Sequence, residues 1–261
     1  MIGYGQDAVW AGPDALRRRI RVEGSRINWV EAGSGPPLIL LHGYGGSARW
    51  WTRNMAALGR VRRTYALDLP GFGHSRLAGR FTFERTADLI ASWMAKRGID
   101  GADVVSHSMG GQLAAILAAR HPSVVRSLVL TAPAGIPFET GLPGIALRAF
   151  RSRRGGDPKF TPIVLGGVMR AGPRILWQAV QQIRFTDVRE HLGSITAPTL
   201  ILWGEGDGLV TSANGPVLAA AMPTARLHLV PGGRHNLMWE QANIFNEVVT
   251  EFLAAQPAPA R

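Results

Sequence analysis

Val104-Val-Ser-His-Ser-Met-Gly-Gly111 lies between a short apolar run and a long alanine-rich segment with the composition of a helix. A strand followed by a helix that begins at Met109 leaves room only for a tight turn, which lifts Ser108 out of the backbone. Small residues two positions before and after the serine, here Ser106 and Gly110, keep such a turn free of collisions. The pattern predicts a nucleophilic serine at a strand end.

The usual form of this pattern is Gly-x-Ser-x-Gly, and the chain departs from it because Ser106 replaces the first glycine. Serine is small enough for the position. Centring the pattern on Ser106 instead would place the branched Val104 where the turn is crowded. The alternative interpretation is a serine that only caps the following helix through its hydroxyl.

Apolar runs of strand length alternate with helical patterns along most of the chain. An antiparallel hairpin is expected from Arg17, because apolar and polar residues alternate on both sides of Gly24-Ser25. The continuously apolar run 38–41 then predicts a strand buried on both faces. Further strands are expected at 64–68, through Val104 and Val105, and at 125–131, 199–203 and 226–230. The alternation with helices predicts an α/β fold with a mostly parallel central sheet of about eight strands and helices on both faces.

The alternation stops between residues 134 and 192, which predicts an inserted helical lid within one core formed by 1–133 and 193–261. We expect a solvated charged face on the lid, with a clamp for an anionic substrate group as the alternative; its charged residues are Arg148, Arg151, Arg153, Arg154, Lys159, Arg170, Arg174, Arg184 and Arg189 against Glu139, Asp157, Asp187 and Glu190. Its apolar residues are expected to pack mainly onto the core; they include Ile145, Leu147, Phe150, Leu165, Val168, Met169 and Trp177.

A serine hydroxyl needs a base within hydrogen-bond reach, and that base needs a third group to orient it. Among seven histidines, His235 follows the last predicted strand in a loop at the carboxyl edge of the sheet, where sites of open α/β sheets gather. Asp207 follows the preceding strand, and Glu205 is its competitor in the same loop. We favour Asp207 because it lies further from the strand end. The order Ser108, Asp207, His235 is the order of a hydrolase triad.

With these residues in place, the sequence resembles the α/β-hydrolase superfamily from about Arg17 to Leu253. The matching pieces are Leu41-His-Gly-Tyr44, Asp68-Leu-Pro-Gly-Phe-Gly-His-Ser75, Ser106-His-Ser-Met-Gly-Gly111, Trp203-Gly-Glu-Gly-Asp207 and Gly233-Arg-His235. The resemblance implies Ser108 as nucleophile, His235 as base and Asp207 as its partner. It also implies that the backbone N–H groups of Tyr44 and Met109 form the oxyanion hole.

Residue identities narrow the function. Relatives resembling haloalkane dehalogenases and epoxide hydrolases carry an aspartate where this chain has Ser108. We therefore expect a serine hydrolase that cleaves modest-sized, fairly apolar carboxylic esters without a cofactor or metal. The alternatives are a carbon–carbon bond hydrolase of vinylogous diketone acids, a perhydrolase, and a non-catalytic ligand-binding module on the same scaffold.

Composition bounds the partners and the location. The net charge of +11 would ordinarily favour anionic partners, but the basic residues are scattered arginines, so no nucleic-acid partner is expected. No apolar run approaches the roughly 20 residues of a membrane span. The absence of cysteine fits a reducing compartment, and residues 1–7 lack the pattern of a secretory signal. We expect a cytoplasmic protein with a small-molecule ester substrate.

Overall fold

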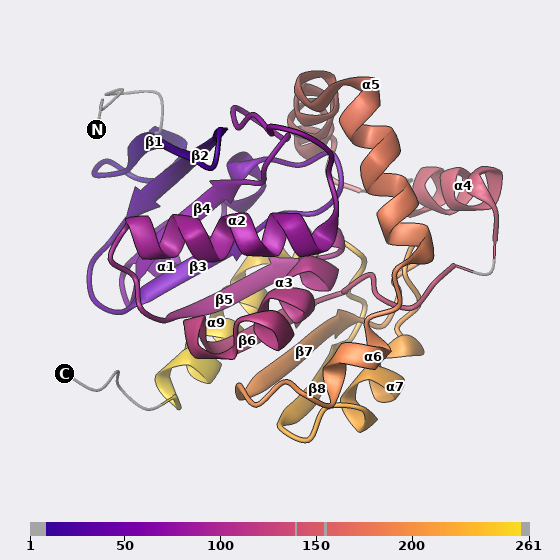
Figure 1. The fold of residues 1–261 in the computed structure, drawn as a ribbon. Helices are drawn as coiled ribbons and strands as arrows, with labels where there is room; N and C mark the ends of the chain where they lie inside the picture. Colours follow the sequence, from indigo (N-terminus) through magenta and orange to yellow (C-terminus); the bar gives the residue numbers. More distant parts are fainter. Residues whose placement is uncertain (1–8, 139, 154–155, 257–261) are drawn as a thin grey trace.

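One eight-stranded sheet organises the chain (Figure 1). The computed structural model describes residues 9–138, 140–153 and 156–256. In chain order the strands are β1 (Leu16–Val22), β2 (Ser25–Ala32), β3 (Pro37–Leu41), β4 (Arg63–Asp68), β5 (Ala102–His107), β6 (Val125–Thr131), β7 (Thr199–Gly204) and β8 (Ala225–Val230). Their spatial order is β1-β2-β4-β3-β5-β6-β7-β8, and only the β1–β2 and β2–β4 pairs are antiparallel. The predicted mostly parallel sheet is confirmed.

The continuous apolar strands serve two cores, because successive side chains of a strand point to opposite faces. In β3, Ile39 and Leu41 join the core on one face, whereas Leu38 and Leu40 join the core on the other. In β5, Val104 and Val105 divide in the same way. Apolar residues are therefore needed on both sides of such a strand, which explains why these runs show no alternation, and the polar residues buried in the strands, such as Ser106 and Ser127, are hydrogen-bonded.

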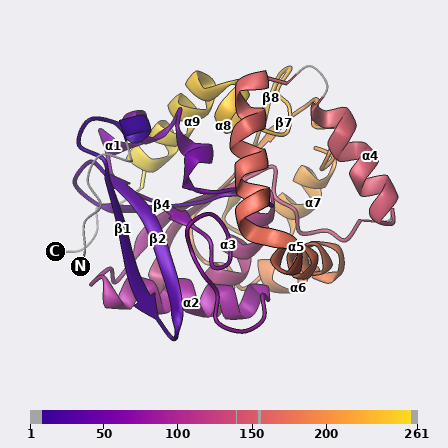
Figure 2. The same ribbon diagram turned by 90° about the horizontal axis from the view of Figure 1, so that it is seen from above.

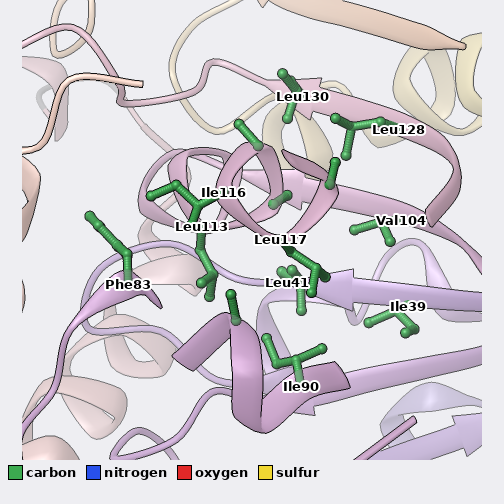
Figure 3. Packing of buried hydrophobic residues seen from close by; sticks show 14 of the residues in the cluster. Ile39, Leu41, Phe83, Ile90, Val104, Leu113, Ile116, Leu117, Leu128 and Leu130 are labelled. Carbon is green, nitrogen blue, oxygen red and sulfur yellow. The ribbon is translucent and has the colours of Figure 1, made fainter. Parts of the chain in front are cut away.

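Helices cover both faces of the sheet (Figures 1 and 2). The first core receives α2 (Phe83–Lys96), α3 (Met109–Arg120), α6 (Arg189–Leu192) and α7 (Asn214–Ala220), and the second receives α1 (Met55–Gly59), α8 (Leu237–Glu240) and α9 (Ala242–Ala254). Figure 3 shows Leu113 and Leu117 of α3 between the strands and Ile90 of α2. This packing fixes the helix that follows Ser108.

The insertion, residues 134–192, carries α4 (Leu142–Arg153) and the long α5 (Thr161–Phe185), and it lies at the carboxyl edge of the sheet (Figure 1). Gly172, with φ of 71°, and Pro173 break α5 into two halves, since neither residue suits a helix interior. Glu139 and Arg154 of the predicted charged face lie outside the described residues. The role of this segment as a lid remains a prediction.

The expectation that the apolar residues of the insertion pack mainly onto the core is wrong for five of the seven residues named above, although others, such as Phe160 and Ile183, are buried in the cores. Val168 lies against Gly45, but Met169 is 80% exposed. Leu147, Phe150, Leu165 and Trp177 are exposed as well. The core is already closed by α2, α3 and α6, so only one side of α5 finds a partner there. Among the described residues, no helix combines the length and apolarity needed to cross a bilayer.

Candidate active site

Ser108 occupies a strained turn between β5 and α3, as the sequence pattern predicts. Its φ of 53° and ψ of −118° lie outside the regions that a serine ordinarily adopts. The turn is held because the Ser108 N–H donates to the Thr131 carbonyl at 2.9 Å. A Cβ on Gly110 would lie 2.4 Å from the Leu41 carbonyl oxygen, so this position accepts only glycine without a shift of the backbone.

Ser106, which replaces the usual first glycine, has a buried partner of its own. Its hydroxyl donates to the Val129 carbonyl of β6 at 2.8 Å. The side chain therefore points into the sheet, away from the turn. Serine in place of the usual glycine at position 106 therefore does not crowd the turn at Ser108.

The structure brings together the three side chains predicted from chain order. His235 Nε2 lies 3.1 Å from Ser108 Oγ, and His235 Nδ1 lies 2.7 Å from Asp207 Oδ2. All three residues are buried, with exposures of 9%, 4% and 8% for Ser108, His235 and Asp207. They come from three loops that follow β5, β8 and β7, which end at the same edge of the sheet.

Asp207 is built to stay ionised. Burial acts to raise the pKa of its carboxyl, but the nearby imidazole of His235 and the hydrogen bonds to the carboxylate outweigh burial and lower that pKa. Oδ1 accepts from the N–H groups of Leu209 and Val210 at 2.8 and 3.0 Å, and Oδ2 also accepts from the indole of Trp203 at 3.2 Å. Because an ionised carboxylate only accepts, His235 Nδ1 must carry the proton. Nε2 is then free to accept the proton of the Ser108 hydroxyl.

Glu205, the competing carboxylate, is exposed, whereas Asp207 turns back to the buried side of the loop. The Asp207 N–H donates to the Gly204 carbonyl at 3.2 Å, which closes the turn. The structure therefore places Asp207, and not Glu205, against His235.

His107 is a residue whose importance the sequence reasoning missed. It is fully buried, its ring centroid lies 4.8 Å from that of His235, and its Nε2 donates to the His235 carbonyl at 2.9 Å. It thus holds the backbone of the residue that faces Ser108. The two residues lie 128 positions apart, and no spacing in the sequence indicates their contact.

Two backbone N–H groups belong to residues close to the serine, one in the loop after β3 and one at the start of α3. In the part of the chain that the structure describes, neither the Tyr44 nor the Met109 N–H donates to a protein acceptor. The loop that carries Tyr44 approaches closely, because a Cβ on Gly43 would lie 3.2 Å from Ser108 Cβ. Met109 begins α3, whose dipole favours negative charge at this end. These amides are placed as oxyanion donors would be.

The first half of α5 rests directly on the loop that carries Tyr44. A Cβ on Gly167 would lie 2.1 Å from the Gly45 carbonyl oxygen, so the helix approaches the loop closely only because this residue is glycine. The Tyr44 hydroxyl also donates to the Leu176 carbonyl in the second half of α5, at 3.3 Å. The insertion and the loop that carries Tyr44 and Gly45 are therefore in direct contact.

We expect Gly167→Ala to displace α5 or the loop, since the methyl group would overlap the Gly45 carbonyl. Overpacking of this kind costs about 1–3 kcal/mol, and ester turnover should fall because the Tyr44 N–H shifts with the loop. Gly166→Ala is the matched control, because its methyl group would meet only the guanidinium end of Arg170 at 3.1 Å. Thermal unfolding and ester kinetics of both variants test this. Equal behaviour of the two would contradict the contact.

Two buried histidines make the protein sensitive to acid. Burial lowers the pKa of His42 to about 4 and that of His107 to about 3. His42 Nε2 accepts from the Leu69 N–H at 3.1 Å, which requires the unprotonated nitrogen, whereas the donation of Nδ1 to the Gly43 carbonyl at 2.8 Å acts to raise the pKa and is outweighed by burial. In the unfolded chain both imidazoles take up a proton near the ordinary histidine pKa of 6.5.

Below about pH 6.5 the unfolded state therefore binds more protons than the folded state, and the free energy of unfolding falls as the pH falls toward about 4. Each histidine contributes a slope of up to about 1.4 kcal/mol per pH unit. Urea unfolding at several pH values should show this slope for the wild type. His107→Asn should be less stable at neutral pH but should have a shallower slope, and an unchanged slope would count against a neutral buried His107.

No metal site accompanies this arrangement within the described ranges, because no three histidine, aspartate or glutamate side chains gather as ligands there. The carboxylate of Asp68, the last residue of β4, is structural. It accepts from the N–H groups of Ala48 and His74 at 2.8 and 2.9 Å, and a Cβ on Gly73 would lie 2.4 Å from it.

Comparison with known proteins identifies the family. The family model described as alpha/beta hydrolase fold matches residues 36–165. The chain is 30% identical to 2-hydroxy-6-oxo-6-phenylhexa-2,4-dienoate hydrolase of Burkholderia cepacia, over 88% of this chain and 91% of the relative. It is also 30% identical to pimeloyl-[acyl-carrier protein] methyl ester esterase of Neisseria meningitidis, over 83% of this chain and 93% of the relative.

Among solved structures, a bacterial membrane phospholipase A is similar with a TM-score of 0.82 and 26% identity, covering 94% of this chain and 87% of that one. The sheet order, the strained serine turn and these similarities agree with one another. The chain belongs to the α/β-hydrolase family.

Proposed function

We propose that this hydrolase cleaves carboxylic esters of modest size and fairly apolar character through a covalent acyl-enzyme. The observation that carries the proposal is the hydrogen-bonded series of Ser108, His235 and Asp207 beside two unpartnered backbone N–H groups. A hydroxyl, a neutral imidazole and an ionised carboxylate in this order are the parts of an activated serine nucleophile.

In the first half of the reaction, Ser108 Oγ attacks the ester carbonyl carbon while His235 Nε2 takes the hydroxyl proton. The carbonyl oxygen becomes an oxyanion, which accepts hydrogen bonds from the Tyr44 and Met109 N–H groups. Each such donor contributes roughly a hundredfold or more to the rate. When the carbon–oxygen bond to the alcohol breaks, His235 gives its proton to the leaving oxygen, and the acyl group remains on Ser108.

In the second half, a water molecule attacks the acyl carbon and His235 takes one of its protons. The second tetrahedral intermediate collapses with release of the carboxylic acid, and the proton returns to Ser108 Oγ. Throughout, Asp207 accepts from His235 Nδ1 and stabilises the imidazolium that forms in each half. The proposed reaction balances with the protein, the ester and one water molecule as its components.

A second candidate is the hydrolysis of a carbon–carbon bond in a vinylogous diketone acid. The Burkholderia cepacia relative is a hydrolase of a 2-hydroxy-6-oxo-dienoate. In this chain a hollow of about 180 Å³ lies beside the Asp207 loop, lined by Ile136, Phe138 and Val210 together with Arg148. Its lining also includes Thr140, Thr211 and Asn214, so it offers an arginine for a carboxylate together with apolar and polar side chains for the rest of such a substrate.

A substrate panel separates the two candidates. We would measure kcat/KM for nitrophenyl esters of increasing acyl length and for a vinylogous diketone acid, with the wild type and Arg148→Gln. The ester proposal expects the esters to be the better substrates and to be little affected by Arg148→Gln. A diketone acid that is cleaved far faster, with a loss on Arg148→Gln, would establish the second candidate. The absence of any acyl-enzyme burst with every activated ester would favour a non-catalytic binding module.

A further inference from the structure

The six most exposed large apolar side chains among the described residues all belong to α4 and α5. Met169 is 80% exposed, Phe185 68% and Trp177 57%, and they are accompanied by Leu147, Phe150 and Leu165. Single exposed apolar residues are ordinary on a protein surface, but a concentration of large ones on one segment marks an interaction surface.

Four of these side chains belong to α5, and helical spacing gathers them on its outer face. In the first half, Leu165 and Met169 are four residues apart and share one side, opposite the buried Gly167. In the second half, Arg174, Trp177 and Phe185 follow at spacings that place them on one stripe, opposite the buried Ala179 and Ile183. The inner side contacts the core, and the outer side is exposed to solvent; α5 itself lies at the upper right of the molecule in Figure 1.

The same helices are strongly cationic. Neither α4 nor α5 contains an acidic residue, and their basic residues are Arg148, Arg151, Arg153, Arg170, Arg174 and Arg184. The Arg184 guanidinium lies over the Phe185 ring at 4.8 Å from its centroid, so positive charge and apolar surface are interleaved. We call the outer faces of α4 and α5 the cationic apolar face.

Positive charge continues from α5 onto the neighbouring core. Burial lowers the pKa of His74, and the charges of Arg17, Arg170 and Arg76 lower it further despite the opposing charge of Asp68. The charges of Arg170 in α5, Arg17 in β1 and Arg76 in the loop after β4 therefore all act on His74. The positive region is wider than the insertion alone.

We propose that the cationic apolar face docks on the surface of bilayers that contain anionic lipids. Arginine is attracted to anionic headgroups, while tryptophan, phenylalanine, leucine and methionine gain free energy by entering the boundary between headgroups and acyl chains. A second copy of the chain would bring like charges together. A nucleic acid would attract the arginines, but it would leave Leu165 and Met169 without a favourable environment.

Docking would turn the carboxyl edge of the sheet, where Ser108 lies, toward the bilayer, because the insertion lies at that edge. The inference goes beyond the proposed ester chemistry and does not depend on it. Ser108→Ala should therefore bind vesicles as the wild type does, so that a failure of docking and a failure of catalysis can be told apart.

The experiment is co-sedimentation of the full chain with vesicles of phosphatidylglycerol and phosphatidylcholine in equal parts, and with vesicles of phosphatidylcholine alone. We expect strong binding only to the anionic vesicles, decreasing as salt is added. The variant with both Met169→Gln and Trp177→Gln should bind at least about tenfold more weakly. The variant with both Arg174→Gln and Arg184→Gln should lose about fivefold for each arginine.

Arg60→Gln and Val61→Gln are matched controls, since both residues are exposed and precede β4, at the opposite end of the parallel strands. They should bind as the wild type does. All the substituted side chains are at least partly exposed, so thermal midpoints should stay near that of the wild type and separate lost docking from misfolding. Equal binding by the wild type and both double variants, or no binding to anionic vesicles, would overturn the proposal. A dimer or a nucleic-acid complex that these variants abolish, with vesicle binding unaffected, would overturn it equally.

Discussion

Replacing Ser108 with alanine is expected to reduce ester turnover by about 10⁵- to 10⁶-fold, the scale of effect when the nucleophile of a triad is removed. The Ser108 hydroxyl contacts His235 Nε2 at 3.1 Å, and alanine leaves that imidazole with nothing to activate. The φ of 53° is equally strained for either residue, so the fold should be unaffected. Steady-state kinetics with a short-chain nitrophenyl ester, together with a thermal melt, measure both expectations.

Ser106→Ala is the matched control, because a second serine hydroxyl lies two residues away. That hydroxyl donates to the Val129 carbonyl and points into the sheet. Its loss should cost about 1 kcal/mol of stability and leave turnover nearly intact. Full turnover by Ser108→Ala would refute the nucleophile assignment, and a collapse of turnover in Ser106→Ala at unchanged stability would move that assignment to Ser106.

The fold could be predicted largely because local patterns and the final packing agree. The 38–41 run is apolar at every position and the 125–131 run is mostly apolar, and the structure covers both faces of these strands. The segment from Trp50 to Leu58, whose sequence favours a single helix, is different. It is divided into a 3₁₀ turn (Ala48–Trp51) and α1, and the side-chain amide of Asn54 donates to the Met238 carbonyl at 3.0 Å. A contact with a residue so distant in the sequence overrides the local helical preference.

Part of the candidate site could be predicted from the sequence for a similar reason. The chain order of Ser108, Asp207 and His235 can be read from the strands that precede them, because the carboxyl ends of parallel strands meet at one edge. The contact of His107 with His235 has no counterpart in spacing or composition, since it depends on how two loops pack. The exposure of Met169 and Trp177 could not be foreseen either, because an apolar stripe on a helix does not say which surface covers it.

Replacing Asp207, and not its neighbour Glu205, is also expected to have a large effect on turnover. Asp207→Asn should lower kcat by about 10⁴-fold, because an amide at this position can donate to His235 Nδ1 and so stabilise the wrong tautomer. In that tautomer Nε2 carries the proton and cannot accept one from Ser108. The Leu209 and Val210 N–H groups would still have an oxygen acceptor, so the loop should keep its conformation. Single-turnover kinetics with an activated ester would report the chemical step directly.

Glu205→Gln provides the comparison, because both substitutions replace a carboxylate by an amide of the same shape in one loop. Glu205 is exposed, and Asp207 is hydrogen-bonded to His235 at 2.7 Å. Turnover by Glu205→Gln should therefore stay within about twofold of the wild type, as is usual for surface changes away from a site. If Glu205→Gln lost turnover and Asp207→Asn kept it, the partner of His235 would have to be reassigned. If only Asp207→Asn loses turnover, the reaction depends on the negative charge that is buried beside the His235 imidazole.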